Sequence, residues 1–172
     1  MKVVILMENS TCKDTVVCAH GLSMYIETAR HKILFDMGPD AQFIENAKKL
    51  GVDLTQVDIA FLSHAHNDHC GGLEAFLKLN DHAKVCMQKN AWGQYYVVTP
   101  DKCAYIGLDG ALRAYEDRFV LCEGVQKLDD ELTVFSAVSG RELWSGANDT
   151  LREKIGEDYP RDAFRHEQDL LV

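Results

Sequence analysis

Short apolar runs separated by helical patterns occupy the first ninety residues. Alternating or continuously apolar runs predict β-strands at 2–7, 22–27, 32–35, 58–62 and 84–87. Apolar residues at helical spacing predict one helix from Phe43 to Leu50, with Gly51 as its stop, and a second from Leu73 to Leu79. We therefore expect an α+β fold in which a mixed sheet carries helices on one face.

The pattern changes after residue 90. Residues 90–118 show no clear period and hold several aromatic side chains, so we interpret them as an insertion or lid. Further strands are predicted at 119–121, 131–138 and 166–172, and a short helix at 148–155. Neither an internal repeat nor a linker rich in proline or serine is visible, so residues 1–172 are interpreted as one domain.

Composition narrows the classes of partner. Acidic residues outnumber basic residues by 27 to 18, which gives a net charge of −9. Such a surface repels phosphate backbones and anionic lipid, so we expect neither a nucleic acid nor a membrane partner. No apolar run approaches the length of a membrane span, about 18 residues, and the N-terminus lacks a secretory pattern, so we predict a cytoplasmic protein. Its six cysteines are then expected to be reduced thiols.

The candidate chemistry lies directly after the apolar run at 58–62. Three histidines and one aspartate stand within six positions: His64, His66, Asp68 and His69. Neutral imidazole and carboxylate are ligands for zinc, iron or manganese. Because positions i and i+2 of a strand face the same side, His64 and His66 can hold one cation together. A turn would bring Asp68 and His69 to a second position.

A solvated polar loop rich in histidine is the alternative interpretation of this segment. A single histidine would favour that alternative, whereas four ligand-type side chains at the exit of a buried strand favour a metal site. Gly71 and Gly72 follow, and we expect them to let the backbone turn sharply into the next helix.

The same residues carry a family resemblance. His64-Ala65-His66-Asn67-Asp68-His69 resembles the HxHxDH signature of the metallo-β-lactamase-like superfamily, with a strand before it and Gly-Gly and a helix after it. Residues 33–38 resemble the superfamily's earlier LFDTG turn, with Met37 in place of threonine. A narrower similarity is to the branch of the dihydropterin ribofuranosylaminobenzene phosphate synthases. It rests on residues 20–23, 25–27, 105–107 and 164–168.

The resemblance implies an αββα sandwich with a two-metal site at one edge of its sheets. In that scheme His64 and His66 bind the first ion and Asp68 and His69 the second, with zinc as the expected metal and iron or manganese as alternatives. A hydroxide between the ions attacks an ester, a phosphoester or a related small-molecule substrate, and Asp68 orients it as the catalytic residue. Asp36 resembles the carboxylate that steadies the ligand loop. A lactam substrate is not implied.

The chain departs from the complete superfamily pattern in its later ligands. A further histidine, a bridging aspartate and a last histidine are expected of the family, and no segment around the remaining histidines resembles those motifs. We therefore expect an incomplete sandwich, the N-terminal half plus the insertion. It would bind metal weakly and form homo-oligomers through its exposed sheet. A metal-dependent hydrolase is one hypothesis for the function. A truncated, non-catalytic metal-binding or interaction module is the other.

Two further histidines are candidates for substrate binding. His20 stands in a loop that the resemblance places near the metal edge, and His166 opens the last predicted strand. An ordinary structural role is the alternative for each. His31 and His82 are interpreted as turn residues, and Cys70 as a small buried packing residue. The aromatic residues of the insertion are interpreted as its core, with a pocket for a ring-bearing substrate as the alternative.

Overall fold

The computed structural model describes residues 1–11, 13–138 and 145–172. One of the six cysteines, Cys12, lies outside the described residues. The strands are β1 (Lys2–Met7), β2 (Ser23–Glu27), β3 (Lys32–Phe35), β4 (Ile59–Phe61), β5 (Lys84–Gln88), β6 (Tyr95–Thr99), β7 (Lys102–Tyr105), β8 (Phe119–Cys122), β9 (Gln126–Lys127), β10 (Thr133–Ser136), β11 (Leu151–Glu153) and β12 (Gln168–Leu171). The α-helices are α1 (Gln42–Lys49), α2 (Asn67–Cys70) and α3 (Leu73–Leu79). Short 3₁₀ helices cover Leu54–Gln56, Lys89–Trp92, Gly110–Arg118 and Gly146–Thr150.

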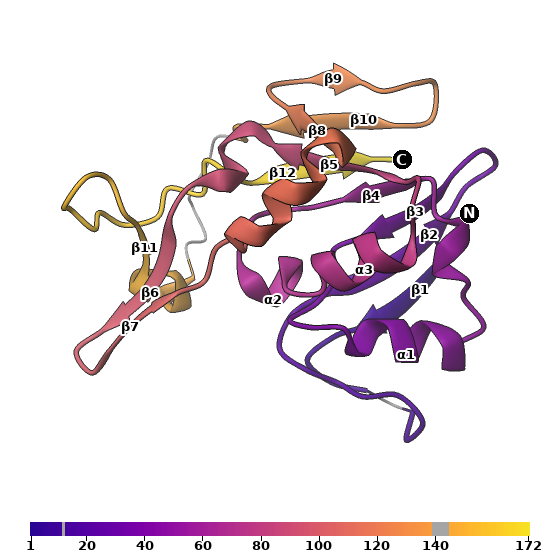
Figure 1. Cartoon of the computed structure of the whole chain (residues 1–172), viewed down its shortest axis with the longest axis horizontal. Helices are drawn as coiled ribbons and strands as arrows, with labels where there is room; N and C mark the ends of the chain where they lie inside the picture. The colour runs from indigo at the N-terminus through magenta and orange to yellow at the C-terminus, as the bar shows by residue number, and fades with distance from the viewer. Residues whose placement is uncertain (12, 139–144) are drawn as a thin grey trace.

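A six-stranded mixed sheet forms the centre of the molecule, in the order β1-β2-β3-β4-β5-β8. The pairs β1–β2 and β2–β3 are antiparallel, whereas β3, β4, β5 and β8 run parallel. Helices α1 and α3 lie against one face of this sheet (Figure 1). The predicted α+β fold, with a mixed sheet and helices on one face, is confirmed.

Alternating side chains of the central strands supply two separate cores. Leu34 and Val85 face the helices and pack with Phe43 of α1 and Phe76 of α3, all fully buried. Ile33 and its neighbours on the opposite face pack against Val134 of β10. This two-sided burial explains why β3, β4 and β5 read as continuous apolar runs in the sequence.

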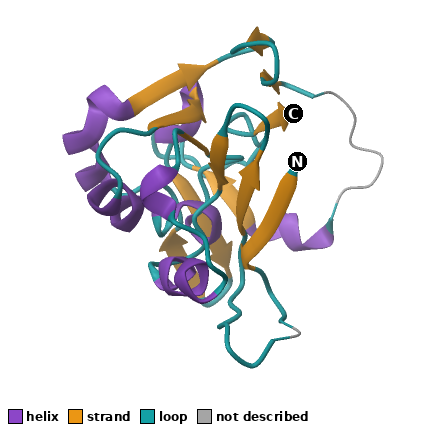
Figure 2. Ribbon diagram, turned by 90° about the vertical axis from the view of Figure 1, so that its right-hand side faces the viewer, coloured by secondary structure: helices purple, strands orange, loops and turns teal. Residues whose placement is uncertain are grey.

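Two smaller sheets complete the described fold. Strands β12-β10-β9 form one and pack across the second face of the central sheet, and β11-β6-β7 form the other. In Figure 2 most of the helices lie on the left-hand side of the strands. The order helix, sheet, sheet corresponds to three consecutive layers of the expected αββα sandwich.

The region expected to be an insertion or lid contains regular structure that the sequence did not predict. Strands β6 and β7 form a hairpin that extends to one side of the molecule (Figure 1). The prediction of a short helix at 148–155 is wrong, because the 3₁₀ turn Gly146–Thr150 leads into β11, which pairs with β6. Tertiary pairing therefore overrides the local pattern at these residues.

Gly71 and Gly72 serve close packing and not a sharp turn. Both have right-handed helical dihedrals at the boundary between α2 and α3. A Cβ on Gly71 would lie 2.0 Å from the carbonyl oxygen of Pro39, and one on Gly72 would lie 2.3 Å from that of Met37. Only glycine lets these backbones approach so closely.

The described cysteines are free thiols, and apolar side chains are exposed on the edge strand β1. Cys70 is buried as expected, and the cysteines among the described residues are free. Val3 and Ile5 are about half exposed on the edge strand β1, at 49% and 48%. The expected self-association through the sheet stays a prediction. Within the described ranges, no helix has the length and apolar character needed to cross a membrane.

Candidate metal centre

The candidate metal ligands gather at the edge of the central sheet where parallel strands end. Asp36 directly follows β3 and the segment from Ser63 to His69 follows β4. Because β3 and β4 are parallel neighbours, their carboxyl ends bring these residues together. Helix α2 carries Asp68 and His69, and its first backbone N–H, that of Asn67, donates to the carbonyl of Ile106 at 2.7 Å.

Three of the four predicted ligands converge. His64, Asp68 and His69 offer ligand atoms that all lie within 4.8 Å of one another. The rings of His64 and His69 have centroids 4.2 Å apart, and His69 Nε2 lies 3.6 Å from Asp68 Oδ2. The ring of His66 is adjacent, with its centroid 4.8 Å from that of His64. This set of nitrogen and carboxylate donors fits a divalent cation such as zinc, iron or manganese.

Asp36 is fully buried and contacts the ligand segment directly. Its Oδ2 lies 2.7 Å from His69 Nδ1 and accepts from the Ser63 hydroxyl at 2.7 Å, and its Oδ1 accepts from the Ser63 backbone N–H at 2.8 Å. Burial raises the pKa of Asp36, and the hydrogen bonds from His69 and Ser63 oppose that rise. Since the carboxylate occupies Nδ1, His69 presents Nε2 to the candidate centre.

His64 is held through Ser63. The Ser63 hydroxyl donates its proton to Asp36, so it can accept from His64 Nδ1, which lies 3.0 Å away. Burial, followed by the nearby rings of His69 and His66, holds the pKa of His64 well below 6.5. His64 is therefore neutral near pH 7 and keeps an Nε2 lone pair, as a metal ligand requires.

A second, buried group adjoins His66 and includes a residue that sequence reasoning missed. Asp162 Oδ2 lies 2.9 Å from His66 Nε2 and 3.1 Å from His166 Nε2. Asp162 is 1% exposed and His166 is 0% exposed. These three residues also place their ligand atoms within 4.8 Å of one another. Asp162 stands in an irregular segment between β11 and β12, and no local pattern in the sequence marks it.

His166, predicted from sequence to contact substrate, is fully buried in the structure. The side chain is enclosed, and both ring nitrogens have partners, since Nδ1 accepts from the backbone N–H of Ala65 at 2.9 Å. The hydrogen-bond contacts of His166 are therefore with other residues of the protein interior. The burial follows from the course of β12, which passes directly beside the metal loop, where the Gln168 backbone N–H donates to Ser63 O at 2.8 Å.

His20 lies at the rim of the candidate centre. Its side chain is 83% exposed, and its Nε2 is 3.3 Å from Asp68 Oδ2. The next residue, Gly21, has a φ of +128°, and a Cβ there would lie 1.9 Å from the carbonyl oxygen of Asp68. Glycine is thus needed for the loop of His20 to reach Asp68. A substrate contact by His20 stays a prediction.

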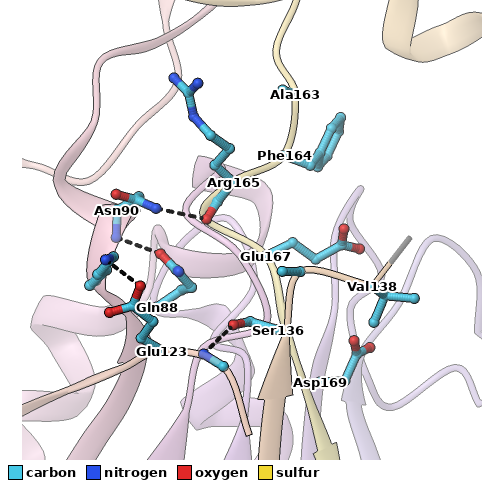
Figure 3. A pocket seen from close by; sticks show the side chains of 13 residues that line it. Gln88, Asn90, Glu123, Ser136, Val138, Ala163, Phe164, Arg165, Glu167 and Asp169 are labelled. Carbon is cyan, nitrogen blue, oxygen red and sulfur yellow. Dashed lines mark hydrogen bonds and ion pairs between the residues drawn. The ribbon is translucent and has the colours of Figure 1, made fainter. Parts of the chain in front are cut away.

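A cavity of about 370 Å³ opens beside the centre, at the carboxyl ends of β5 and β8. Figure 3 shows Phe164 on its wall and the Arg165 guanidinium pointing away from Ser136 and Asp169. That guanidinium pairs with Glu153 at 2.6 Å. The Phe164 ring, which lines this cavity, lies 5.3 Å from the His66 ring and 6.2 Å from the His64 ring, so this wall of the cavity adjoins the two histidines.

Three comparisons relate this arrangement to known proteins. Residues 17–91 match the family model of the metallo-beta-lactamase superfamily. The chain is 30% identical over 135 residues to "Uncharacterized protein MJ0448" of Methanocaldococcus jannaschii, which covers 76% of this chain and 50% of that protein. It is 32% identical over 88 residues to 7,8-dihydropterin-6-methyl-4-(beta-D-ribofuranosyl)-aminobenzene-5'-phosphate synthase of the same organism, covering 48% and 30%.

A solved structure extends the similarity over nearly the whole chain. Tm1679, a metal-dependent hydrolase of the beta-lactamase superfamily, superposes with a TM-score of 0.77 at 25% identity. The match covers 99% of this chain and 60% of that one. The chain spans half the length, or less, of the curated relatives it matches.

Proposed function

We propose that this chain, which carries a metallo-beta-lactamase superfamily domain, binds divalent metal at residues 64–69 and serves the hydrolysis of a small ester, phosphoester or related molecule. Zinc is the metal we propose. The observation that carries the proposal is the convergence of His64, Asp68 and His69 at one sheet edge, with donors of the kind that zinc prefers. The similarity to a metal-dependent hydrolase supports it.

Each residue of the centre has a distinct task in this proposal. A divalent cation, when bound, supplies a Lewis acid that lowers the pKa of a water molecule and offsets negative charge on the substrate. His64 and His69 present Nε2, because Ser63 and Asp36 occupy their Nδ1 atoms. The Asp68 side chain is 24% exposed, so its carboxylate can both ligate and face an incoming substrate. It can orient a water molecule and accept its proton.

For the substrate, we propose a chemical class and not a single compound. A small molecule is favoured over nucleic acid or a membrane surface because the net charge is −9. The synthase among the relatives has a phosphate ester in its name, and this supports including phosphoesters in a first screen. A cytoplasmic location belongs to the proposal as well.

The test combines metal content with turnover. Purified protein is dialysed, loaded with Zn²⁺ or Mn²⁺ and analysed by elemental mass spectrometry, then assayed with nitrophenyl phosphomonoesters and phosphodiesters, carboxyl esters and thioesters. We expect bound metal, and turnover that His64→Ala abolishes and His82→Ala, a change at an exposed histidine, preserves. Turnover that survives His64→Ala would remove this centre from the reaction.

A non-catalytic metal-binding or interaction module is the second candidate. The donor count favours it: among the described residues, the converging set at the sheet edge has three members, and two tetrahedral ions need more protein ligands. Metal binding that depends on His64, without turnover on any substrate of the screen, would select this candidate.

A further inference from the structure

A buried carboxylate links the segment before β12 to the metal loop. Asp162 Oδ2 sits between two imidazole nitrogens, at 2.9 Å from His66 Nε2 and 3.1 Å from His166 Nε2. Its Oδ1 accepts from the backbone N–H of Phe164 at 2.7 Å. Asp162 thus meets two imidazole nitrogens and one backbone N–H, and it serves as the shared acceptor of all three contacts.

The protonation pattern of His166 follows from its partners. Nδ1 accepts from the Ala65 backbone N–H at 2.9 Å, so Nδ1 carries no proton. Nε2 must then bear the proton that it donates to Asp162. The ring is held in place by Tyr95, whose centroid lies 3.9 Å away, and by Phe164 at 5.6 Å. His166 is thus a fixed, neutral donor.

The same carboxylate sets the proton position on His66. Because Asp162 only accepts, His66 Nε2 carries the proton of their shared hydrogen bond. In the neutral ring this leaves Nδ1 as the nitrogen with a free lone pair. His66 lies between His64 and the Asp162–His166 pair, with ring centroids at 4.8 Å on both sides.

These occupied atoms argue against a separate metal centre at His66, Asp162 and His166. A metal there would compete with the Ala65 N–H for Nδ1 of His166, or displace the Nε2 proton that satisfies Asp162. Either change would leave a buried polar group without its hydrogen-bond partner, which is unfavourable.

We propose that Asp162 and His166 are positioning residues that fix the tautomer and ring orientation of His66, so that its Nδ1 serves the metal centre of residues 64–69. A carboxylate behind a ligating histidine orients the ring and raises its basicity. His166 in turn fixes the carboxylate. The pair thereby makes metal affinity depend on a segment about 96 residues away in sequence. The metal part of this inference rests on the proposed function, whereas the tautomer part does not.

The first experiment uses metal-free protein and reads the tautomer. Long-range ¹H–¹⁵N correlation spectra of the ¹⁵N-labelled full chain should show a proton on Nε2 and none on Nδ1 in both His66 and His166. Asp162→Ala should convert His66 to a mixture of the two tautomers, and Asp158→Ala, a change at an exposed carboxylate of the same segment, should not. A His66 ring protonated at Nδ1 in the unaltered chain would overturn the proposal.

The second experiment measures Zn²⁺ affinity by competition with a chromophoric chelator. Asp162→Ala should weaken binding about 10–100-fold, the range for partners that orient a metal ligand. Asp162→Asn keeps the shared acceptor and should restore part of the affinity, and Asp158→Ala should match the unaltered chain. Unchanged affinity in a folded Asp162→Ala protein would refute the assignment. So would an additional tightly bound ion that His166→Ala removes.

The proposal stays testable if a variant fails to fold or if the chain binds no Zn²⁺. If Asp162→Ala fails to fold, the same two measurements are made on Asp162→Asn and His166→Phe. The phenylalanine keeps the aromatic packing of His166. If the unaltered chain binds no Zn²⁺, the proposed function fails while the tautomer measurement still tests the Asp162–His66 contact.

Discussion

Asp36 and His69 connect the end of β3 to helix α2 through a hydrogen bond of 2.7 Å between Oδ2 and Nδ1. A second link supports it, since the backbone N–H of Met37 donates to the carbonyl of His69 at 2.8 Å. Asp36 holds a φ of +55°, a conformation that a non-glycine residue adopts at a cost when the surroundings require it. The turn after β3 thus forms hydrogen bonds to both the side chain and the backbone of His69, a candidate metal ligand.

Asp36→Ala should therefore weaken both the fold and the metal centre. The change leaves partly buried donors of Ser63 and His69 without their acceptor, at a cost of up to about 1–3 kcal/mol for each group. We expect urea denaturation to show a lower free energy of unfolding. Chelator competition should show Zn²⁺ affinity reduced about 10–100-fold.

Asp81→Ala is the matched control for that variant, because Asp81 is fully exposed in a turn. Equal stability and equal Zn²⁺ affinity of Asp36→Ala and Asp81→Ala would contradict the steadying role of Asp36.

A methyl group at Gly71 should separate α2 from the loop of Pro39. The added Cβ would meet the Pro39 carbonyl oxygen at 2.0 Å, which is backbone and cannot rotate away. We expect Gly71→Ala to lower the free energy of unfolding by about 1–3 kcal/mol or more, as in other overpacked sites. Differential scanning fluorimetry would record the loss as a lower Tm.

Gly110→Ala supplies the comparison, since nothing lies within 4 Å of a Cβ at that position. Its Tm should stay near that of the unaltered chain. A Gly71→Ala protein as stable as Gly110→Ala would show that the backbone at Pro39 moves away from the added methyl group at little cost.

The elements that sequence alone predicts are those whose signal is local. Strands β1 to β5 and helices α1 and α3 each carry their own apolar pattern, and the cluster at 64–69 is contiguous, so both were visible without any tertiary information. Because β3 and β4 pair in parallel in the central sheet, Asp36 lies next to His69, which is 33 positions later in the sequence.

Features that depend on distant partners were not predictable in this way. Strand β11 has three residues and exists through its pairing with β6, some 54 positions earlier at Leu151 and Val97. Asp162 is surrounded by irregular backbone, and only the packing of its segment against Ala65 and His66 gives it a role. Nothing in its immediate sequence distinguishes it from the exposed aspartates of the chain.

His31, interpreted from sequence as a turn residue, joins two hairpins in the structure. Its Nδ1 lies 2.9 Å from Asp58 Oδ2 and its Nε2 lies 2.5 Å from Asp129 Oδ2. Burial lowers the pKa of His31, but the hydrogen bonds to Asp129 and Asp58 outweigh burial and raise it above 6.5. The backbone N–H of Glu131 and His31 together lower the pKa of Asp129 to about 2.

The stability contributed by these groups should therefore depend on pH in two directions. A raised histidine pKa stabilises the fold fully below pH 6.5, and this contribution is lost as pH rises through the raised value. A lowered aspartate pKa stabilises the fold above pH 3.8, and this contribution is lost as pH falls toward about 2. Urea unfolding at a series of pH values should show the largest contribution between these limits.

His31→Gln should remove the decline on the alkaline side, because glutamine does not titrate. Part of the acidic decline should remain, since the Glu131 N–H still bonds Asp129. His82→Gln, at an exposed histidine of another turn, should leave both declines in place. An unchanged alkaline decline in His31→Gln would assign it to another group.

Metal should stabilise the folded chain if residues 64–69 bind it. A ligand that binds only the folded state at 100 times its Kd adds about 2.7 kcal/mol to the free energy of unfolding. For a chain of 172 residues this corresponds to a Tm increase of about 5–10 °C. Scanning calorimetry with and without Zn²⁺, followed by removal with a chelator, would measure the increase and its reversal. His64→Ala should lose the increase because it deletes one of three converging donors, whereas His82→Ala should retain it. An equal increase in both variants would place the stabilising ion elsewhere on the protein.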